Sequence, residues 1–458
     1  MEPDGWRLVT ARLEPQGVEQ RAPEAGTSAP RDVRVTTCCV VGAGPAGAVL
    51  ALFLARQGIP VVLLEAHGDL DRDFRGDTVH PAILEALDAV GVADRLLAAV
   101  PHRKLRAITV PTEPPVRLDF AGLRTRFPFI AVIRQAQFLA FLTEEAARSP
   151  SFELVLRADV RELVAAGGLV RGVRYRSPDG WHEARALLTV GAGGRGRSAR
   201  RRAGLRAVTT SPPVDVLWFR LPRRPADPEG LVTAVGAGHF LLLVDRGDEW
   251  QIAAAIPKGT YPAQRAAGLE PLRRTVAVLV PWLAVRVDAL DDWRRVALLS
   301  VASDRLERWY RPGLLLLGDA AHDMSPFGGN GINYAVQDAV AAANRLSAPL
   351  RAGRHSLRDL AAVQRRRDWP TRLTQAAVAL AQDALFSRVL RAARPAGPPR
   401  PLRPPGALRL LLRVPVLREL PLRWVAFGLW PVRVSARVAR GVRPAAAGVL
   451  PVAPAGGG

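Results

Sequence analysis

Residues 40–66 read VVGAGPAGAVLALFLARQGIPVVLLEA, which places three glycines within six positions and then stays apolar until one carboxylate, Glu65. An apolar strand before the glycines, a helix-length segment after them and a second apolar strand form a strand, helix, strand unit. Gly42 permits a tight turn, Gly44 lets the backbone approach a pyrophosphate, and Gly47 lets helix and strand pack closely. The pattern predicts a dinucleotide-binding site.

The same unit supplies groups for the phosphates and the ribose. A helix that begins at Pro45 and Ala46 offers free N–H groups and about half a positive charge to an anion. Glu65, followed by Ala66 at the end of the second strand, is placed to accept hydrogen bonds from ribose hydroxyls. A lone GxGxxG is weak evidence, but this one has its strands, its helix and its acid at the required spacing.

A second glycine motif distinguishes a flavin from a nicotinamide nucleotide. Residues 311–339 read RPGLLLLGDAAHDMSPFGGNGINYAVQDA and place Gly318 and Asp319 at the mouth of a buried strand. Asp319 can accept hydrogen bonds from a ribityl chain, which nicotinamide nucleotides lack. The loop that follows opens a helix, whose backbone donors can polarise the pyrimidine edge of an isoalloxazine ring. The residues expected at this helix start are Gly331, Ile332 and Asn333.

With these motifs the chain resembles the group A flavoprotein monooxygenases, which share the fold of para-hydroxybenzoate hydroxylase. The resemblance covers about residues 35–382. Besides the first glycine motif, it is carried by RDFRGDTVHPAILEAL (72–87), VDVLWFRLPRRPADPEG (214–230), AIPKG (255–259) and RPGLLLLGDAAHDMSP (311–326). It implies an FAD site built from three discontinuous segments, with a substrate-binding sheet over the flavin.

The expected fold class is α/β: a Rossmann-like FAD-binding domain with an inserted, mostly antiparallel substrate-binding sheet, followed by C-terminal helices. The expected segments are a disordered leader (1–33), an FAD-binding domain (34–103, 131–208 and 301–345), a substrate-binding sheet domain (104–130 and 209–300) and a C-terminal helical region (346–458).

The resemblance also implies roles for residues outside the first glycine motif. Arg75 would approach the pyrophosphate or ribityl chain, and Arg134, at the start of the helix RQAQFLAFL, would reach the cofactor. The predicted catalytic loop at the flavin edge, where oxygen reacts, contains Pro326, Gly328 and Gly329. The alternatives are solvated arginines and an ordinary turn.

The middle motif departs from the family pattern. In VGAGGRGRSARR (190–201), Gly193 stands where the family has an aspartate that serves FAD binding and the reaction with the pyridine nucleotide. Arg195 and Arg197 can still bind phosphate, but reduction by NAD(P)H is in question and an external reductase is the alternative. Asn330 in the flavin loop is a second departure.

The function implied is that of an FAD-dependent monooxygenase. Reduced FAD adds dioxygen at C4a, and the hydroperoxide transfers one oxygen atom to a small aromatic or polyketide-like substrate, with NAD(P)H as reductant. Because the cofactor supplies the chemistry, few catalytic side chains are needed. His80 and His322 would need partner geometry to act as acid or base. Trp218, Phe219 and Trp250 are expected either in an apolar pocket or in the core.

Two other functions fit the same residues. An FAD-dependent reductase or dehydrogenase of the same fold is supported by Gly193 and would form product without dioxygen. A non-catalytic flavin-binding protein at a membrane surface is supported by the basic, amphipathic residues 408–442. Pro415 and Pro421 interrupt a long helix there, which favours a helical cap on the FAD-binding domain.

The composition narrows partners and location. The net charge is +22, but only Lys104 and Lys258 are lysines among 64 basic residues, which indicates an arginine-rich bias and not a nucleic-acid surface. Cys38 and Cys39 are adjacent on a predicted strand and cannot form a disulfide framework. The polar N-terminus lacks an apolar signal core, and no apolar run approaches the ~20 residues of a membrane span. We expect a cytoplasmic protein with no metal site and no nucleic-acid partner.

Overall fold

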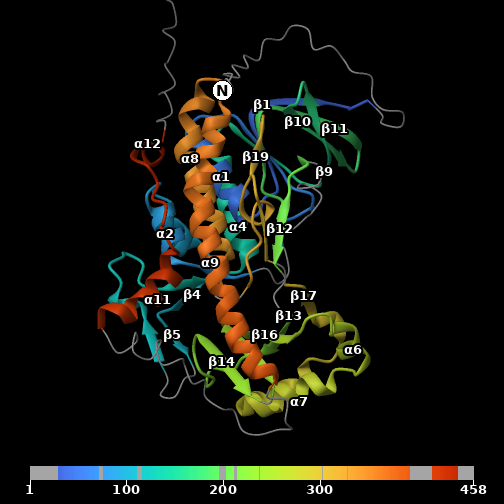
Figure 1. The fold of residues 1–458 in the computed structure, drawn as a ribbon, viewed down its shortest axis with the longest axis vertical. Helices are drawn as coiled ribbons and strands as arrows, with labels where there is room; N and C mark the ends of the chain where they lie inside the picture. Colours follow the sequence, from blue (N-terminus) through green and yellow to red (C-terminus); the bar gives the residue numbers. More distant parts are fainter. Residues whose placement is uncertain are drawn as a thin grey trace, which may run out of the picture.

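The structure is a computed structural model that describes residues 29–71, 76–110, 116–194, 203–210, 214–236, 238–301, 303–326, 329–391 and 415–441. A large sheet and most helices form the upper half in Figure 1, and a second sheet with short helices forms the lower half. The α/β fold class is confirmed. Most of the predicted leader, residues 1–28, lies outside the described part of the chain.

The large sheet is built around β1, which pairs in parallel with β11 on one side and β2 on the other. Its strand order is β19-β20-β11-β1-β2-β8, and β10 and β9 extend antiparallel from β11. The hairpin between β10 and β11 turns at the sequence SPDG, from Ser177 to Gly180. The strands are β1 (Val33–Val41), β2 (Val61–Leu64), β8 (Phe152–Val155), β9 (Asp159–Ala166), β10 (Leu169–Ser177), β11 (Gly180–Gly191), β19 (Tyr310–Arg311) and β20 (Leu314–Leu316).

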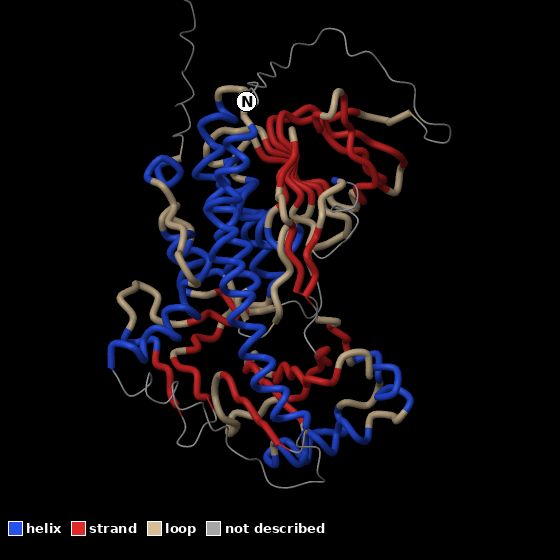
Figure 2. The backbone as a smooth tube through the Cα atoms, in the orientation of Figure 1, coloured by secondary structure: helices blue, strands red, loops and turns tan. Residues whose placement is uncertain are grey.

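Helix α1 (Pro45–Ala55) is buried around its whole circumference from Ala46 to Ala55. It packs against the sheet and against α4 and α8, which explains why its sequence is apolar on every face. Figure 2 shows these helices gathered on one side of the parallel strands. The other helices are α2 (Pro81–Asp88), α3 (Ala93–Ala99), α4 (Gln135–Ala147), α6 (Tyr261–Ala266), α7 (Glu270–Leu279), α8 (Gly331–Arg351), α9 (Leu357–Arg391), α11 (Pro415–Phe427) and α12 (Ala436–Arg440).

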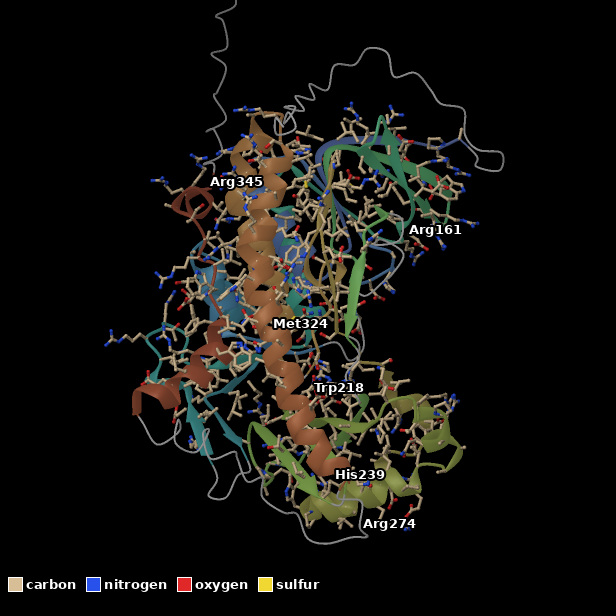
Figure 3. All side chains as sticks on the ribbon, in the orientation of Figure 1. Arg161, Trp218, His239, Arg274, Met324 and Arg345 are labelled. Carbon is tan, nitrogen blue, oxygen red and sulfur yellow. The ribbon has the colours of Figure 1, made fainter. Side chains whose placement is uncertain are left out.

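The second sheet is antiparallel, in the order β14-β15-β16-β13-β17. Phe219 and Trp250 are buried in the core between this sheet and α7, so they do not line a pocket. Trp218 points to the opposite face because side chains alternate along a strand. Figure 3 shows Trp218 at the upper margin of this sheet, below Met324. The strands are β13 (Val214–Pro222), β14 (Leu231–Gly236), β15 (His239–Asp245), β16 (Glu249–Pro257) and β17 (Ala297–Leu299).

Three small sheets and the C-terminal helices connect the two halves. Helix α9 runs from the upper half down to the lower sheet (Figure 1). Helix α11 packs on α2 and β6, with Leu422 and Ala426 buried beside Phe120. Among the described residues, no helix is both long and apolar enough to cross a membrane. The small sheets contain β3 (Thr78–Val79), β4 (Arg103–Leu105), β5 (Ala107–Val110), β6 (Val116–Asp119), β7 (Ile130–Val132), β12 (Ala207–Thr210) and β18 (Ser303–Leu306).

Candidate functional site

The first glycine turn connects β1 to α1, and close backbone contacts require two of its glycines. Gly42 has φ +101°, and a Cβ there would overlap the Cα of Gly193. A Cβ at Gly47 would overlap the carbonyl oxygen of Gly42. At Gly44, the N-cap of α1, a Cβ would come no closer than 3.7 Å to Ala192 O. Packing therefore explains Gly42 and Gly47, whereas the space beside Gly44 is open for a ligand.

Glu65 braces this turn from the end of β2. Its side chain is buried, and Oε2 accepts a hydrogen bond from Ala43 N at 2.8 Å. Oε1 lies 2.7 Å from His67 Nδ1. Ala66, the next residue, is exposed. At the adjacent helix end, Pro45 occupies the first turn and no side chain caps the N-terminus, so the first-turn N–H groups of Ala46 and Gly47 have no intrahelical acceptor.

The second glycine motif meets the first at the same edge of the sheet. Gly318 and Asp319 lie in the 3-10 turn η4 (Gly318–Ala320), just after β20. Gly318 has φ +57°, and a Cβ there would lie 3.2 Å from the Cβ atoms of Ala46 and Ala335. The start of α1, the GD turn and α8 are therefore in direct contact, although they are far apart in the sequence.

The loop that precedes α8 forms the third wall. Gly329 N donates to Pro326 O at 3.0 Å, which closes a turn, and Gly329 has φ +66°. Thr78 Oγ1 donates to Gly329 O at 3.5 Å. A Cβ at Gly76 would lie 3.3 Å from Ile332 Cδ1, so the loop before β3 adjoins the start of α8. Three residues predicted to bind, Arg75, Arg195 and Arg197, and one of the predicted catalytic loop, Gly328, lie outside the described part of the chain.

Buried polar atoms without partners surround the start of α8. Asn330 Oδ1 and Asn333 Nδ2 have no hydrogen-bond partner among the described residues, although both side chains are buried. His80 Nε2 is a third such atom. The pyrimidine edge of an isoalloxazine ring alternates carbonyl oxygens with an N–H group, so it offers partners to amide donors and acceptors alike. The residues present here therefore fit FAD.

A buried charged network holds the GD turn against α8 and α9. Asp338 Oδ2 accepts a hydrogen bond from Gly318 N at 3.1 Å and lies 2.6 Å from His322 Nε2. Asp338 Oδ1 accepts from Arg367 Nε at 2.9 Å. Burial acts to raise the pKa of Asp338, but the His322 and Arg367 interactions outweigh it, and the pKa is lowered. His322 thus supports the turn.

Arg134, the N-cap of α4, lies at a cavity of about 360 Å³ near this site. Its Nη2 is 3.7 Å from Asp248 Oδ1. Arg246 lines the same cavity with a side chain only 6% exposed, and its Nε is 3.2 Å from Asp77 Oδ2. Burial raises the pKa of Asp77, and the charge of Arg246 is the largest opposing effect. Arg246 was not predicted, because no local pattern connects it with Asp77.

Comparison with known proteins gives the family. The profile of the FAD binding domain family matches residues 34–377. The chain is 34% identical over 411 residues to 6-methylpretetramide 4-monooxygenase from Streptomyces rimosus, a match that covers 88% of this chain and 95% of that protein. It is 28% identical over 316 residues to 12-dehydrotetracycline 5-monooxygenase/anhydrotetracycline 6-monooxygenase from the same species, covering 66% of this chain and 60% of that protein.

Solved structures share the fold. OxyS anhydrotetracycline hydroxylase from Streptomyces rimosus superposes with a TM-score of 0.68 at 24% identity, over 86% of this chain and 76% of that one. PqsL from Pseudomonas aeruginosa superposes with a TM-score of 0.66 at 21% identity, over 78% of this chain and 98% of that one.

Proposed function

This chain belongs to the FAD-dependent group A monooxygenases, and we propose that it hydroxylates a polycyclic aromatic polyketide with dioxygen. The observation that carries the proposal is the meeting of the two glycine motifs, with Gly318 packed against Ala46. This contact brings the phosphate-binding helix end and the flavin loop to one site. When bound there, FAD supplies the oxygen-activating chemistry.

The residues of the chain hold and orient that cofactor. The open N-terminus of α1 beside Gly44 receives the pyrophosphate, because its backbone N–H groups and dipole favour an anion. Asp319 receives the ribityl hydroxyls. At the other end of the cofactor, Asn330 and Asn333 provide hydrogen-bonding atoms that lack a partner within the described protein. Their burial excludes water from this end of the site.

The residues on one face of the second sheet are consistent with a flat, apolar substrate. Its face opposite α7 carries Val216, Trp218 and, on β16, Ala253 and Ala255. Trp218 Nε1 is buried, has no partner in the part of the chain that the structure describes, and can donate to an oxygen on the substrate. Relatives that act on 6-methylpretetramide and anhydrotetracycline support a polycyclic polyketide as the substrate class.

We infer that NADH or NADPH is the reductant, and Gly193 makes this step the one to test. The holoenzyme is titrated with each nucleotide under argon, and bleaching of the flavin absorbance is recorded. An enzyme that either nucleotide reduces agrees with the proposal. Bound flavin that neither nucleotide bleaches would indicate an external reductase.

Hydroxylation is tested with isotopic oxygen. The reduced holoenzyme receives a polycyclic polyketide such as 6-methylpretetramide together with ¹⁸O₂, and the product is analysed by mass spectrometry. We expect one ¹⁸O atom in the product and no product under argon. A product that forms equally well without dioxygen would favour the reductase alternative and refute the monooxygenase reaction.

A further inference from the structure

Helix α11, in the C-terminal region, ends beside the loop that precedes α8. This loop contains Pro326, Gly329 and Asn330 and is called the flavin loop. The last carbonyls of a helix have no partner within that helix, so other groups must satisfy them. Here the partners come from the candidate cofactor site. His80 Nδ1 lies 2.6 Å from Val425 O, and Gln337 Nε2 donates to Phe427 O at 2.9 Å. His80 precedes α2, and Gln337 lies one turn after Asn333 on α8.

The contact with Phe427 fixes the orientation of two amides. Gln337 Oε1 accepts from Val432 N and from Arg367 Nη1, both at 3.3 Å, so its nitrogen must face Phe427 O. The same nitrogen donates to Asn333 Oδ1 at 3.0 Å. Asn333 therefore turns its Nδ2 away from Gln337, and this donor is the buried atom without a partner at the flavin loop.

The contact with Val425 fixes the tautomer of His80. A carbonyl oxygen only accepts, so the proton of the neutral ring must be on Nδ1. His80 is 1% exposed, and burial lowers its pKa more than the backbone contacts with Val425 and Gly329 raise it, which favours the neutral ring. Nε2 is then a hydrogen-bond acceptor. It faces the flavin loop, 3.7 Å from the position that a Cβ on Gly329 would take.

We propose that α11 is part of the cofactor site: its terminal carbonyls hold His80 with Nε2 as an acceptor and Asn333 with Nδ2 as a donor toward the bound flavin. His80 is thus a positioning residue, and the C-terminal segment gains a role in orienting the flavin. This inference rests on the FAD site described above. It is independent of the identity of the substrate.

The test distinguishes the roles of the two ring nitrogens of His80. His80→Asn places an amide donor where Nδ1 was and has no atom in place of Nε2, whereas His80→Leu removes both. We expect the Kd of the apoprotein for FAD to rise about 3- to 10-fold in both variants, with a changed visible spectrum of the bound flavin. The free energy of unfolding should stay near the wild-type value in His80→Asn, which keeps a donor for Val425 O. It should fall in His80→Leu, which has no such donor. A purely structural histidine would give His80→Asn a wild-type Kd and spectrum.

A second variant approaches the site from the C-terminal segment. Gly428 has φ +73°, and a Cβ there would lie 3.2 Å from Gln337 Nε2. Gly428→Ala should therefore displace Gln337 and change the flavin spectrum in the folded protein. The matched control is His355→Gln, because His355 is also buried, pairs with a backbone carbonyl through Nε2 and has an Nδ1 without a partner among the described residues, so the Gln amide keeps the paired nitrogen and omits the other.

The control should keep the wild-type Kd and spectrum. Equal effects in His355→Gln, or wild-type spectra in both His80→Asn and Gly428→Ala, would overturn the inference. A wild-type chain that binds no FAD would overturn it together with the proposed function. A chain that shows the His80 and Gly428 effects but hydroxylates no polyketide would support the inference and refute only the proposed reaction.

Discussion

At the scale of single residues, the three glycines of the first turn have different physical roles. Gly47 has no room for a methyl group, because the Gly42 carbonyl occupies that space, whereas Gly44 has room. We expect Gly47→Ala to lower the free energy of unfolding of the apoprotein by about 1–3 kcal/mol, as overpacking does. Gly44→Ala should change it by about 1 kcal/mol at most, since only a helix cap is affected.

For the affinity for FAD we expect the opposite order: Gly44→Ala, the variant with the smaller effect on stability, should have the larger effect on binding. Gly44→Ala should raise the Kd for FAD about tenfold or more in a protein of nearly normal stability, because the methyl group enters the space left for the pyrophosphate. Urea denaturation and flavin fluorescence titration give the two quantities. Normal FAD affinity in Gly44→Ala would show that the cofactor does not approach this turn.

Gly193 gives a second prediction at the same scale. A Cβ at this position would meet only Val41 O, at 3.7 Å, and the residue is exposed, so Gly193→Asp should fold with stability within about 0.5 kcal/mol of the wild type. If the missing carboxylate limits the reaction with NAD(P)H, the variant should bleach its flavin faster under argon. Stopped-flow absorbance measures this rate. An unchanged rate would mean that Gly193 does not limit reduction.

At the scale of elements, α8 and α9 are joined to the GD turn by the buried ion pair of Asp338 and Arg367, both with side chains 0% exposed. Arg367→Met leaves the buried carboxylate of Asp338 without the positive charge of its arginine partner. Removing one partner of a buried pair costs about 3–5 kcal/mol. Denaturation of the apoprotein by urea should show a loss of this size.

The control for this substitution lies on the same helix. Arg372 on α9 pairs with Asp368 but has a side chain 49% exposed, so Arg372→Met should change the free energy of unfolding by less than about 1 kcal/mol. Similar losses in the two variants would contradict the assigned role of the buried pair.

The sequence predicted elements well where a local pattern determines them. The strand, helix, strand unit around Gly42 and the helix from Gly331 each depend on short-range periodicity and turn chemistry. The face of Trp218 was not predicted, because period-2 alternation orients a strand only once the covering helix is known. The start of α8 was expected at the flavin, but the role of Gln337 was missed although it lies one helical turn from Asn333.

At the scale of the whole molecule, the site depends on contacts that sequence periodicity does not encode. Val425 meets His80 across 345 positions, and Arg246 meets Asp77 through a hairpin of the second sheet. The family resemblance predicted that distant segments converge on FAD. It gave no reason to place α11 there, because the return of a C-terminal helix depends on tertiary packing by residues such as Leu422 and Ala426.

Buried histidines in distant parts of the fold give a prediction for the stability of the whole protein. Burial lowers the pKa of His80, His239 and His355 from the ordinary value of 6.5. As the pH falls below about 6.5, the unfolded chain binds protons that the folded chain does not, so the free energy of unfolding decreases. His80 and His355 each contribute up to about 1.4 kcal/mol per pH unit until their folded pKa is reached. His239 is more exposed, so solvent screening makes its contribution smaller.

This acid instability should be measured on the apoprotein by urea denaturation at pH 7.5, 6.5 and 5.5. The carboxylates with lowered pKa, such as Asp215 and Asp338, lose their contribution only at lower pH, because their ordinary value is 3.8. The loss between pH 6.5 and 5.5 therefore belongs to the histidines, because the raised pKa of Asp77 makes a contribution of the opposite sign. His80→Asn and His355→Asn should each flatten the slope, and the double variant should flatten it most. An unchanged slope in both His80→Asn and His355→Asn would mean that these rings are charged in the folded protein, and the acceptor state of His80 Nε2 would then be wrong as well.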